Sequence, residues 1–345
     1  MRTWKANIIN GRALRSGLLD KLKNVVTERF NDKYSREDIV DVLLAAALRK
    51  ESIEYSADGP NGDTVFYRLK KDLSVEKLQS LIYHSRPKIR HPILVSIDVH
   101  DQMTWSEKVP YVIGTAEKNG SFRAFKFLTA KSASQPRCVL DVDIMKDGSV
   151  TDATIAMLER LLKDYKMETV LMDGGFPSSQ LIEYLTSKGI NYVCRFRSTS
   201  KLRKMDIEYK TPYLYRTQYR KRCGRPNTVA SEYYIYRYHG RGKYDYYLIS
   251  NMLDSPEEIR ELFRRRWDIE TGYREQKRLK IKTTTRNYLL RLLFFLISSI
   301  IYNLWIRLKD TFGFRLNHIK SALLKAILKT HEKEAGGTFG TTDKS

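Results

Sequence analysis

ILVSIDVH at residues 93–100 is a run of apolar and β-branched residues, and it predicts a buried β-strand that carries Asp98 near its end. Seven further segments can be read from their periodicity, and in chain order they are strands at 109–116, 122–129 and 138–145, a helix at 151–165, a strand at 169–173, a helix at 178–189 and a strand at 190–196. Strands that first follow one another and then alternate with helices indicate a mixed sheet covered by helices. The sequence therefore predicts an α/β fold.

The segments on either side of this region have a different character. Apolar residues at helical spacing, with Ser35 and Asp38 placed to cap a helix, predict a helical unit at the N-terminus. Residues 198–247 are rich in Tyr and Arg and alternate like exposed β-hairpins, which indicates an insertion. The expected division is a helical unit (1–85), the first part of the core (86–197), a β-rich basic insertion (198–250), the second part of the core (251–310), and a C-terminal helix with a disordered tail (311–345).

The charge balance indicates a polyanionic partner. Lys and Arg number 62 against 40 Asp and Glu, which gives a net charge of +22 and favours nucleic acid. An anionic membrane is the alternative partner, but the basic residues are spread along segments with folded patterns and are not stacked beside an anchor. The apolar run from Leu292 to Trp305 is shorter than the roughly 20 residues that a membrane span needs. We therefore interpret it as a buried helix and expect no membrane association.

Cysteine usage and the N-terminal residues bear on the compartment. Cys138, Cys194 and Cys223 lie far apart and form no CxxC pair, so neither a disulfide framework nor a structural zinc site is indicated. The first residues lack the uninterrupted apolar run of a signal peptide. We expect a cytoplasmic protein that associates with the nucleoid through DNA.

Three carboxylates stand out by their positions. Asp98 follows ILVSI at or near the end of a central strand, and Asp173 ends the strand TVLMD and precedes two glycines. Each acid alone has an ordinary structural explanation as a strand cap or turn residue. Strand-end carboxylates from separate strands, together with Glu270 on a helix, can gather hard oxygen ligands around Mg²⁺ or Mn²⁺. We therefore predict that these three residues bind two metal ions for in-line displacement at phosphorus.

The helix expected to begin at Ser255 carries a polar stripe. Its members recur at i, i+4, i+7 and i+11 and so share one face: Arg266, Glu270, Tyr273 and Lys277. A solvated face held by ion pairs is the ordinary interpretation. Trp267 and Ile269 indicate instead that much of this helix is buried, so a carboxylate here needs a partner.

The stretch FRRRWDIETGYREQK at residues 263–277 resembles the Y-x2-R-x3-E-x6-K signature of cut-and-paste insertion-sequence transposases, whose RNase H-like core carries a DDE triad. In this resemblance Asp98 and Asp173 are similar to the two catalytic aspartates, and Glu270 to the glutamate. The resemblance assigns Arg266 and Lys277 to phosphates near the cut, and Tyr273 shares their face. It covers roughly residues 90 to 308 and implies an RNase H-like fold with a β-stranded insertion between the second aspartate and the glutamate.

The sequence departs from the signature in two respects. Phe263 stands at the tyrosine position, and no Trp occurs between Trp105 and Trp267. The second departure matters because members of the family use an aromatic residue of the insertion to hold a flipped base. If a base is flipped here, the aromatic residue has to be one of four tyrosines: Tyr213, Tyr215, Tyr219 or Tyr234.

The segment from residue 195 to 225 contains 11 Lys or Arg interleaved with tyrosines. Phosphate contacts combined with base stacking explain this mixture, and we predict that Arg220, Lys221 and Arg222 bind DNA. The alternative is an exposed basic hairpin with a ladder of tyrosines.

Four other acids lie near the predicted ligands: Asp101, Asp141, Asp143 and Glu275. Asp101 has the opposite strand parity to Asp98, so only one of the two can face the site, and parity alone does not choose between them. Asp141 and Asp143 precede no glycine turn, and Glu275 lies about 140° around the helix from Glu270. We interpret the last three as structural and keep Asp101 as the alternative to Asp98.

Together these observations predict a DNA transposase that cleaves at insertion-sequence ends and transfers the 3′-OH to target DNA by two-metal catalysis. The resemblance implies that the N-terminal helices recognise the terminal repeats and that a homodimer joins two ends. An RNase H-like nuclease or resolvase without strand transfer is one alternative, and a catalytically silent DNA-binding derivative is another.

Overall fold

The computed structural model describes residues 9–27, 33–55, 59–70, 73–107, 109–146, 149–209, 211–220, 228–240 and 244–336. The chain divides into two compact units. One unit comprises Met1–Arg86 and Tyr273–Ser345, and the other comprises Pro87–Gly272. This division by contacts groups the N-terminal helices with the C-terminal ones, whereas the sequence-based division separates them by expected role.

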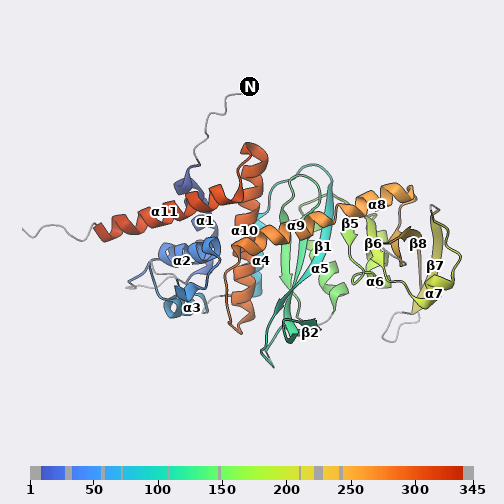
Figure 1. The fold of residues 1–345 in the computed structure, drawn as a ribbon, viewed down its shortest axis with the longest axis horizontal. Coiled ribbons are helices and arrows are strands. Elements are labelled where there is room, and N and C mark those ends of the chain that lie inside the picture. Colours follow the sequence, from blue (N-terminus) through green and yellow to red (C-terminus); the bar gives the residue numbers. More distant parts are fainter. Residues whose placement is uncertain are drawn as a thin grey trace, which may run out of the picture. The chain divides into compact units, whose positions relative to one another are not determined.

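The unit Pro87–Gly272 is built on a nine-stranded mixed sheet with the order β2-β3-β1-β5-β6-β9-β8-β7, and β4 pairs with β3 beside this path (Figure 1). The strands are β1 (Ile93–Met103), β2 (Val112–Lys118), β3 (Ser121–Ser132), β4 (Val139–Ile144), β5 (Met167–Met172), β6 (Asn191–Phe196), β7 (Tyr213–Arg220), β8 (Thr228–His239) and β9 (Asp245–Ser250). β1, β5 and β6 run parallel, and β3 is antiparallel to β1. This is the RNase H-like arrangement that the sequence predicts.

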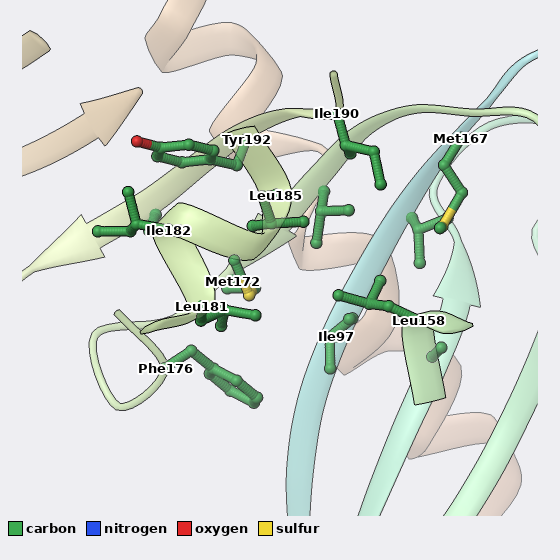
Figure 2. Packing of buried hydrophobic residues seen from close by; sticks show 14 of the residues in the cluster. Ile97, Leu158, Met167, Met172, Phe176, Leu181, Ile182, Leu185, Ile190 and Tyr192 are labelled. Atoms are coloured by element: carbon green, nitrogen blue, oxygen red, sulfur yellow. The ribbon is translucent and has the colours of Figure 1, made fainter. Parts of the chain in front are cut away.

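Successive side chains of β1 point to opposite faces of the sheet and enter two different hydrophobic clusters. Ile93, Val95 and Ile97 belong to a large cluster with residues of α5 (Val150–Leu162) and α6 (Ser179–Ser187). Figure 2 shows Leu158 and Leu181 in this cluster together with Ile97 and Met172. Leu94 instead belongs to a second cluster with Ile259 of α8 (Pro256–Arg264). Helices therefore cover both faces of the sheet, and even-numbered residues of β1 point to the α8 side.

The Tyr-rich insertion is not a set of exposed hairpins. β9 pairs with β6, and β8 pairs with β9, so the insertion extends the central sheet. Tyr236, Tyr238 and Tyr247 are buried, and the Tyr236 hydroxyl donates to the carbonyl oxygen of Met252 at 2.7 Å. The expectation of exposure was wrong for these tyrosines of β8 and β9, because tyrosine carries a large apolar ring, which can be buried when its hydroxyl finds an acceptor. Tyr213 and Leu214 of β7 are exposed, as expected.

The helix that begins after Ser255 starts as predicted but does not continue unbroken. Ser255 and Glu258 form a capping box, with Pro256 in the first turn. The helix is interrupted at Arg265 and Arg266, and a second helix, α9, runs from Trp267 to Gln276. At the break, Arg265 and Arg266 donate backbone hydrogen bonds to the carbonyls of the residues three positions earlier, so the α-helical i to i−4 pattern is interrupted. The expectation of one continuous helix was therefore wrong.

The other unit is helical. Its α-helices are α1 (Gly11–Leu22), α2 (Arg36–Arg49), α3 (Gly62–Lys70), α4 (Val75–Ser85), α10 (Tyr288–Phe312) and α11 (Leu316–Gly336). The predicted cap on α2 is present, because Ser35 and Asp38 form a reciprocal capping box. The tail expected to be disordered is AGGTFGTTDKS at residues 335–345. Its first two residues, Ala335 and Gly336, belong to α11, so the expectation was wrong for them, and residues 337–345 lie outside the described residues.

Helix α10 contains the apolar run that resembles a membrane segment. It has 25 residues, longer than the run itself, and is apolar enough to cross a membrane by length and composition. In its most apolar window, 83% of the residues are buried within the structure. This burial agrees with the interpretation of the run as a core helix.

Candidate active site

Asp98 and Asp173 are brought to neighbouring positions by a parallel strand pair. Ile97 of β1 is in register with Met172 of β5, and both side chains enter the large core. Asp98 is the next residue of β1, and Asp173 is the residue that follows β5. Because side chains alternate, Asp98 faces the opposite side, the side covered by α8. β1 continues to Met103, so Asp98 lies inside the strand. The prediction that Asp98 lies at or near the end of its strand was therefore wrong.

The electrostatics of Asp98 reveal what surrounds it. The pKa of this carboxyl is raised to about 6, mainly by burial and to a smaller extent by the charges of Asp173 and Glu270. The Arg266 guanidinium and the backbone N–H of Val99, which donates to Asp98 Oδ1 at 2.9 Å, oppose that rise in pKa. The three predicted carboxylates therefore share one local electrostatic field, and Arg266 is the cation that lowers the pKa of Asp98.

Arg266 is that cation, and it is almost fully buried. Its Nη2 donates to Glu270 Oε1 at 3.1 Å, and its guanidinium carbon lies 5.4 Å from the ring centre of Phe263. The phenyl ring at the position of the signature's tyrosine therefore still offers a face to the cation. Arg266 is only 6% exposed, and its Nε has no hydrogen-bond partner among the residues that the structure describes.

The spacing and the donor chemistry of these carboxylates bear on whether they can hold a metal ion. Within the described ranges, no three Asp, Glu, His or Cys side chains are arranged to hold one metal ion. The donors are nevertheless of the right kind, because mutually repelling carboxylates are the ligands that Mg²⁺ and Mn²⁺ take. The Glu270 side chain is 41% exposed and accepts a hydrogen bond from the Arg266 guanidinium.

Three buried polar residues beside Asp98 were missed by the sequence analysis. Asp98 is paired across the sheet with Thr129, and Ser96 with Lys131. The Ser96 and Thr129 hydroxyls are buried and, among the described residues, have no hydrogen-bond partner. Lys131 is 3% exposed, and burial lowers its pKa to about 7, against the opposing effect of the Asp98 charge. A lysine in the apolar alternation of FKFLTAKS was the available signal.

Comparison with known proteins establishes the family. A family model described as "Transposase DDE domain" matches residues 97–304, which is more than half of the chain. The chain belongs to this family. The transposase domain match begins one residue before Asp98 and includes both Asp173 and Glu270.

A solved structure shares the fold of this DDE transposase. It is a piggyBac transposase, described as a synaptic complex with hairpin DNA. The identity is 13% and the TM-score is 0.67, over 98% of this chain and 84% of that chain. At this identity the likeness concerns the fold. A search of curated proteins gave no match.

The other acids of the transposase have their own partners. Asp101 accepts a hydrogen bond from the Thr115 hydroxyl at 2.8 Å and lies 3.4 Å from Lys118 Nζ. Odd-numbered residues of β1 face away from the α8 side, so the geometry favours Asp98 over Asp101.

Asp141, Asp143 and Glu275 are also engaged in ion pairs. Arg160 contacts the first two at 2.9 and 3.0 Å, and Arg278 contacts Glu275 at 2.7 Å. These pairs agree with the interpretation of the three acids as structural.

The other residues of the transposase that were predicted to bind DNA lie in different parts of the chain. Tyr273 and Lys277 both belong to the helical unit. Tyr273 is buried. Lys277 is exposed, and it begins a short 3-10 helix that follows α9. Arg220 ends β7 opposite Thr228. Lys221 and Arg222 lie outside the described residues.

Two of the tyrosines considered for base flipping differ in accessibility. Tyr213 is 38% exposed, whereas the Tyr215 ring packs 5.4 Å from that of Tyr233. Tyr234 is partly buried against the cluster on the α8 side. Tyr219 lies in β7, and its side chain is outside the described part of the chain.

Proposed function

We propose that this chain is a DNA transposase that cleaves phosphodiester bonds at the ends of an insertion sequence and transfers the 3′-OH to target DNA. The observation that carries the proposal is the placement of Asp98 on β1 and of Asp173 directly after the paired strand β5, with the Arg266–Glu270 pair close enough to shift the pKa of Asp98. Three carboxylates from a strand, a strand end and a helix are the donor set that two-metal phosphoryl transfer needs. The family match supports the assignment of these positions.

Asp98, Asp173 and Glu270 would hold two Mg²⁺ or Mn²⁺ ions. When bound, such ions polarise the phosphate and lower the pKa of the attacking water. The protein's own residues supply position and charge. The Asp98 carboxylate accepts a hydrogen bond from the Val99 N–H, which holds its position. Arg266 would hold Glu270 by a hydrogen bond until Glu270 binds a metal ion. The guanidinium released by Glu270 would then be free to bind a phosphate oxygen.

DNA is the proposed partner, and the charge of the chain supports it. A net charge of +22 attracts a polyanion, and the structural neighbour was captured as a synaptic complex with hairpin DNA. We further propose that Lys277, Arg220, Lys221 and Arg222 contribute phosphate contacts, that the helical unit recognises terminal repeats, and that a homodimer joins two ends. The protein would act in the cytoplasm on nucleoid DNA.

The test is to incubate the purified full chain with DNA that spans its own gene boundaries, in the presence of Mn²⁺, and to map products to the nucleotide. Cleavage at the element boundary followed by joining to a target duplex supports the proposal. Cleavage without joining would assign the chain to the nuclease or resolvase alternative. Binding without any cleavage would assign it to the catalytically silent alternative.

A further inference from the structure

Four polar residues form a square on the face of the sheet that α8 covers. Asp98 of β1 pairs with Thr129 of β3, and Ser96 pairs with Lys131. Directly paired residues share a face, and so do alternate residues along one strand. Thr129 therefore lies directly across from the first candidate metal ligand, and Ser96 lies beside that ligand along β1. Ser96 and Thr129 are called the hydroxyl pair below.

The hydroxyl pair lies beneath the surface, whereas Asp98 reaches it. Thr129 is 0% exposed and Ser96 is 1% exposed, while Asp98 is partly exposed. Neither hydroxyl can therefore touch DNA in this arrangement. Any part that the hydroxyl pair plays in the reaction has to act through the Asp98 side chain.

On the outer sides of the square, the neighbouring strands present apolar side chains. Ser96 pairs with Leu171 of β5, and Thr129 pairs with Val142 of β4. Both of these side chains are buried, and neither can form a hydrogen bond. The anionic acceptor of the square is thus the Asp98 carboxylate.

The hydroxyl pair is kept at a cost in stability. Ser96 Oγ and Thr129 Oγ1 have no hydrogen-bond partner within the part of the chain that the structure describes. A buried hydroxyl without a partner destabilises the folded state, whereas an apolar side chain of the same shape carries no such cost. Because buried polar groups are normally paired, two unpaired hydroxyls beside a candidate ligand indicate a function that needs them.

The Asp98 carboxylate has acceptor positions left to fill. Its Oδ1 accepts from the Val99 N–H at 2.9 Å, and among the residues that the structure describes no other donor contacts it. An ionised carboxylate offers about four acceptor positions. Carboxylates that bind metal ions are themselves hydrogen-bonded, and these outer hydrogen bonds fix their orientation. The hydroxyl pair carries the donors that such support requires.

We propose that Thr129 and Ser96 are positioning residues for Asp98, and that their hydroxyls donate hydrogen bonds to its carboxylate when Asp98 binds a divalent metal ion. The inference rests on the proposed function, because it takes Asp98 as a metal ligand. Metal binding and the pairing of the two hydroxyls are then coupled. The metal-free protein bears the cost of the unpaired hydroxyls, and the metal-bound protein recovers it.

The experiment measures urea unfolding of the full-length protein, without metal and with a fixed excess of Mn²⁺, at pH 7.5, above the Asp98 pKa of about 6. An ion that binds the folded state alone raises the free energy of unfolding by mass action. The difference between the two conditions therefore reports Mn²⁺ affinity without any measurement of cleavage. The metal-free condition reports the cost of the hydroxyls in the same series.

Thr129→Val should change the two readings in opposite directions. It removes an unpaired hydroxyl at nearly constant shape, so the metal-free urea midpoint should rise. Loss of the outer hydrogen bond should weaken Mn²⁺ affinity about ten-fold, which lowers the gain from Mn²⁺ by about 1.4 kcal/mol. Thr129→Ser keeps the hydroxyl and should keep most of the gain. Ser96→Ala should act in the same direction as Thr129→Val.

Two further variants serve as controls. Ser231 of β8 is 6% exposed, and its hydroxyl likewise has no partner among the described residues. Ser231→Ala should therefore raise the metal-free midpoint and leave the gain from Mn²⁺ unchanged. Asp98→Ala should lose the gain, because it removes the ligand itself.

The outcomes separate this inference from the proposed function. An equal Mn²⁺ gain in the wild type and Thr129→Val overturns the inference, as does a wild type that gains nothing from Mn²⁺ or an Asp98→Ala variant that keeps the gain. A loss in Thr129→Ser as large as that in Thr129→Val would show that packing, and not the hydroxyl, is responsible, which also overturns it. Cutting of boundary DNA by the wild type is measured separately, and its absence overturns the proposed function.

Discussion

Arg266 Nη2 lies 3.1 Å from Glu270 Oε1, although Arg266 is in the turn between two helices and Glu270 is on the second helix. The pair keeps the i,i+4 contact that the sequence spacing predicts, despite the break in the helix. The guanidinium pairs with a carboxylate whose charge raises the pKa of Asp98, and its own positive charge lowers that pKa. The Arg266–Glu270 pair therefore holds the proposed third metal ligand, Glu270, in place beside Asp98.

Replacing Arg266 tests this link. We expect Arg266→Met to slow cleavage of boundary DNA by about a hundred-fold, since it removes a preorganised cation from the reacting phosphate. DNA binding, measured by fluorescence anisotropy, should weaken far less. Arg264→Met is the matched control, because Arg264 pairs with Glu261 on the exposed surface at 3.5 Å. Equal losses in both variants would show that general basic charge, and not this pair, is responsible.

The raised pKa of Asp98 predicts a pH-dependent stability effect. Because the folded state holds this pKa near 6, against the ordinary aspartate value of 3.8, the group's contribution to stability is full below about pH 4 and is lost as the pH rises through 6. We expect Asp98→Asn to raise the free energy of unfolding by about 1–3 kcal/mol at pH 8 and to give no gain at pH 4. Urea denaturation of both proteins at the two pH values measures this, and Asp101→Asn should show no such gain at pH 8.

The same shift predicts how cleavage depends on pH. Asp98 has to be ionised to bind a metal ion, so at limiting Mg²⁺ the rate should fall about ten-fold per pH unit below pH 6. Saturating Mg²⁺ should move the midpoint to lower pH, because metal binding competes with the proton. Single-turnover rates between pH 5 and 8 at two Mg²⁺ concentrations give the answer. A midpoint that does not respond to Mg²⁺ would mean that the titrating group is not a ligand.

Arg160 tests the interpretation of Asp141 and Asp143 as structural. The guanidinium holds both carboxylates, and Asp141 is fully buried. We expect Arg160→Met to destabilise the protein by about 3–5 kcal/mol, because it removes the guanidinium that compensates a buried charge. At a temperature where the variant is folded, its cleavage rate per folded molecule should equal that of the wild type. A selective loss of cleavage would place this cluster in the active site.

The sequence was most informative where a local pattern alone determines the structure. The capping boxes at Ser35 and Ser255 depend on residues three positions apart, and Asp173 follows its strand because the apolar run ends there. The order of strands and helices along the chain from residue 93 to 196 also follows from periodicity. These features need no knowledge of which segments become neighbours.

The features that were missed depend on pairing between distant segments. β1 extends beyond Asp98 because β3 pairs with it as far as Met103, and the tyrosines of β8 are buried because β9 pairs with β6. Lys131 lies beside Asp98 only through the register of β1 and β3. A single strand's alternation shows two faces but does not identify the neighbour across the ladder.

The central claim is that Asp98, Asp173 and Glu270 together carry metal-dependent DNA cleavage. The most direct measurement compares Mn²⁺-dependent cutting of boundary DNA by Asp98→Ala, Asp173→Ala and Glu270→Ala, with Asp101→Ala as the control and DNA affinity measured in parallel. We expect each of the three to lose cutting while retaining most of its DNA affinity, and Asp101→Ala to keep cutting. Cutting at the wild-type position by all three variants would contradict the assignment of the site.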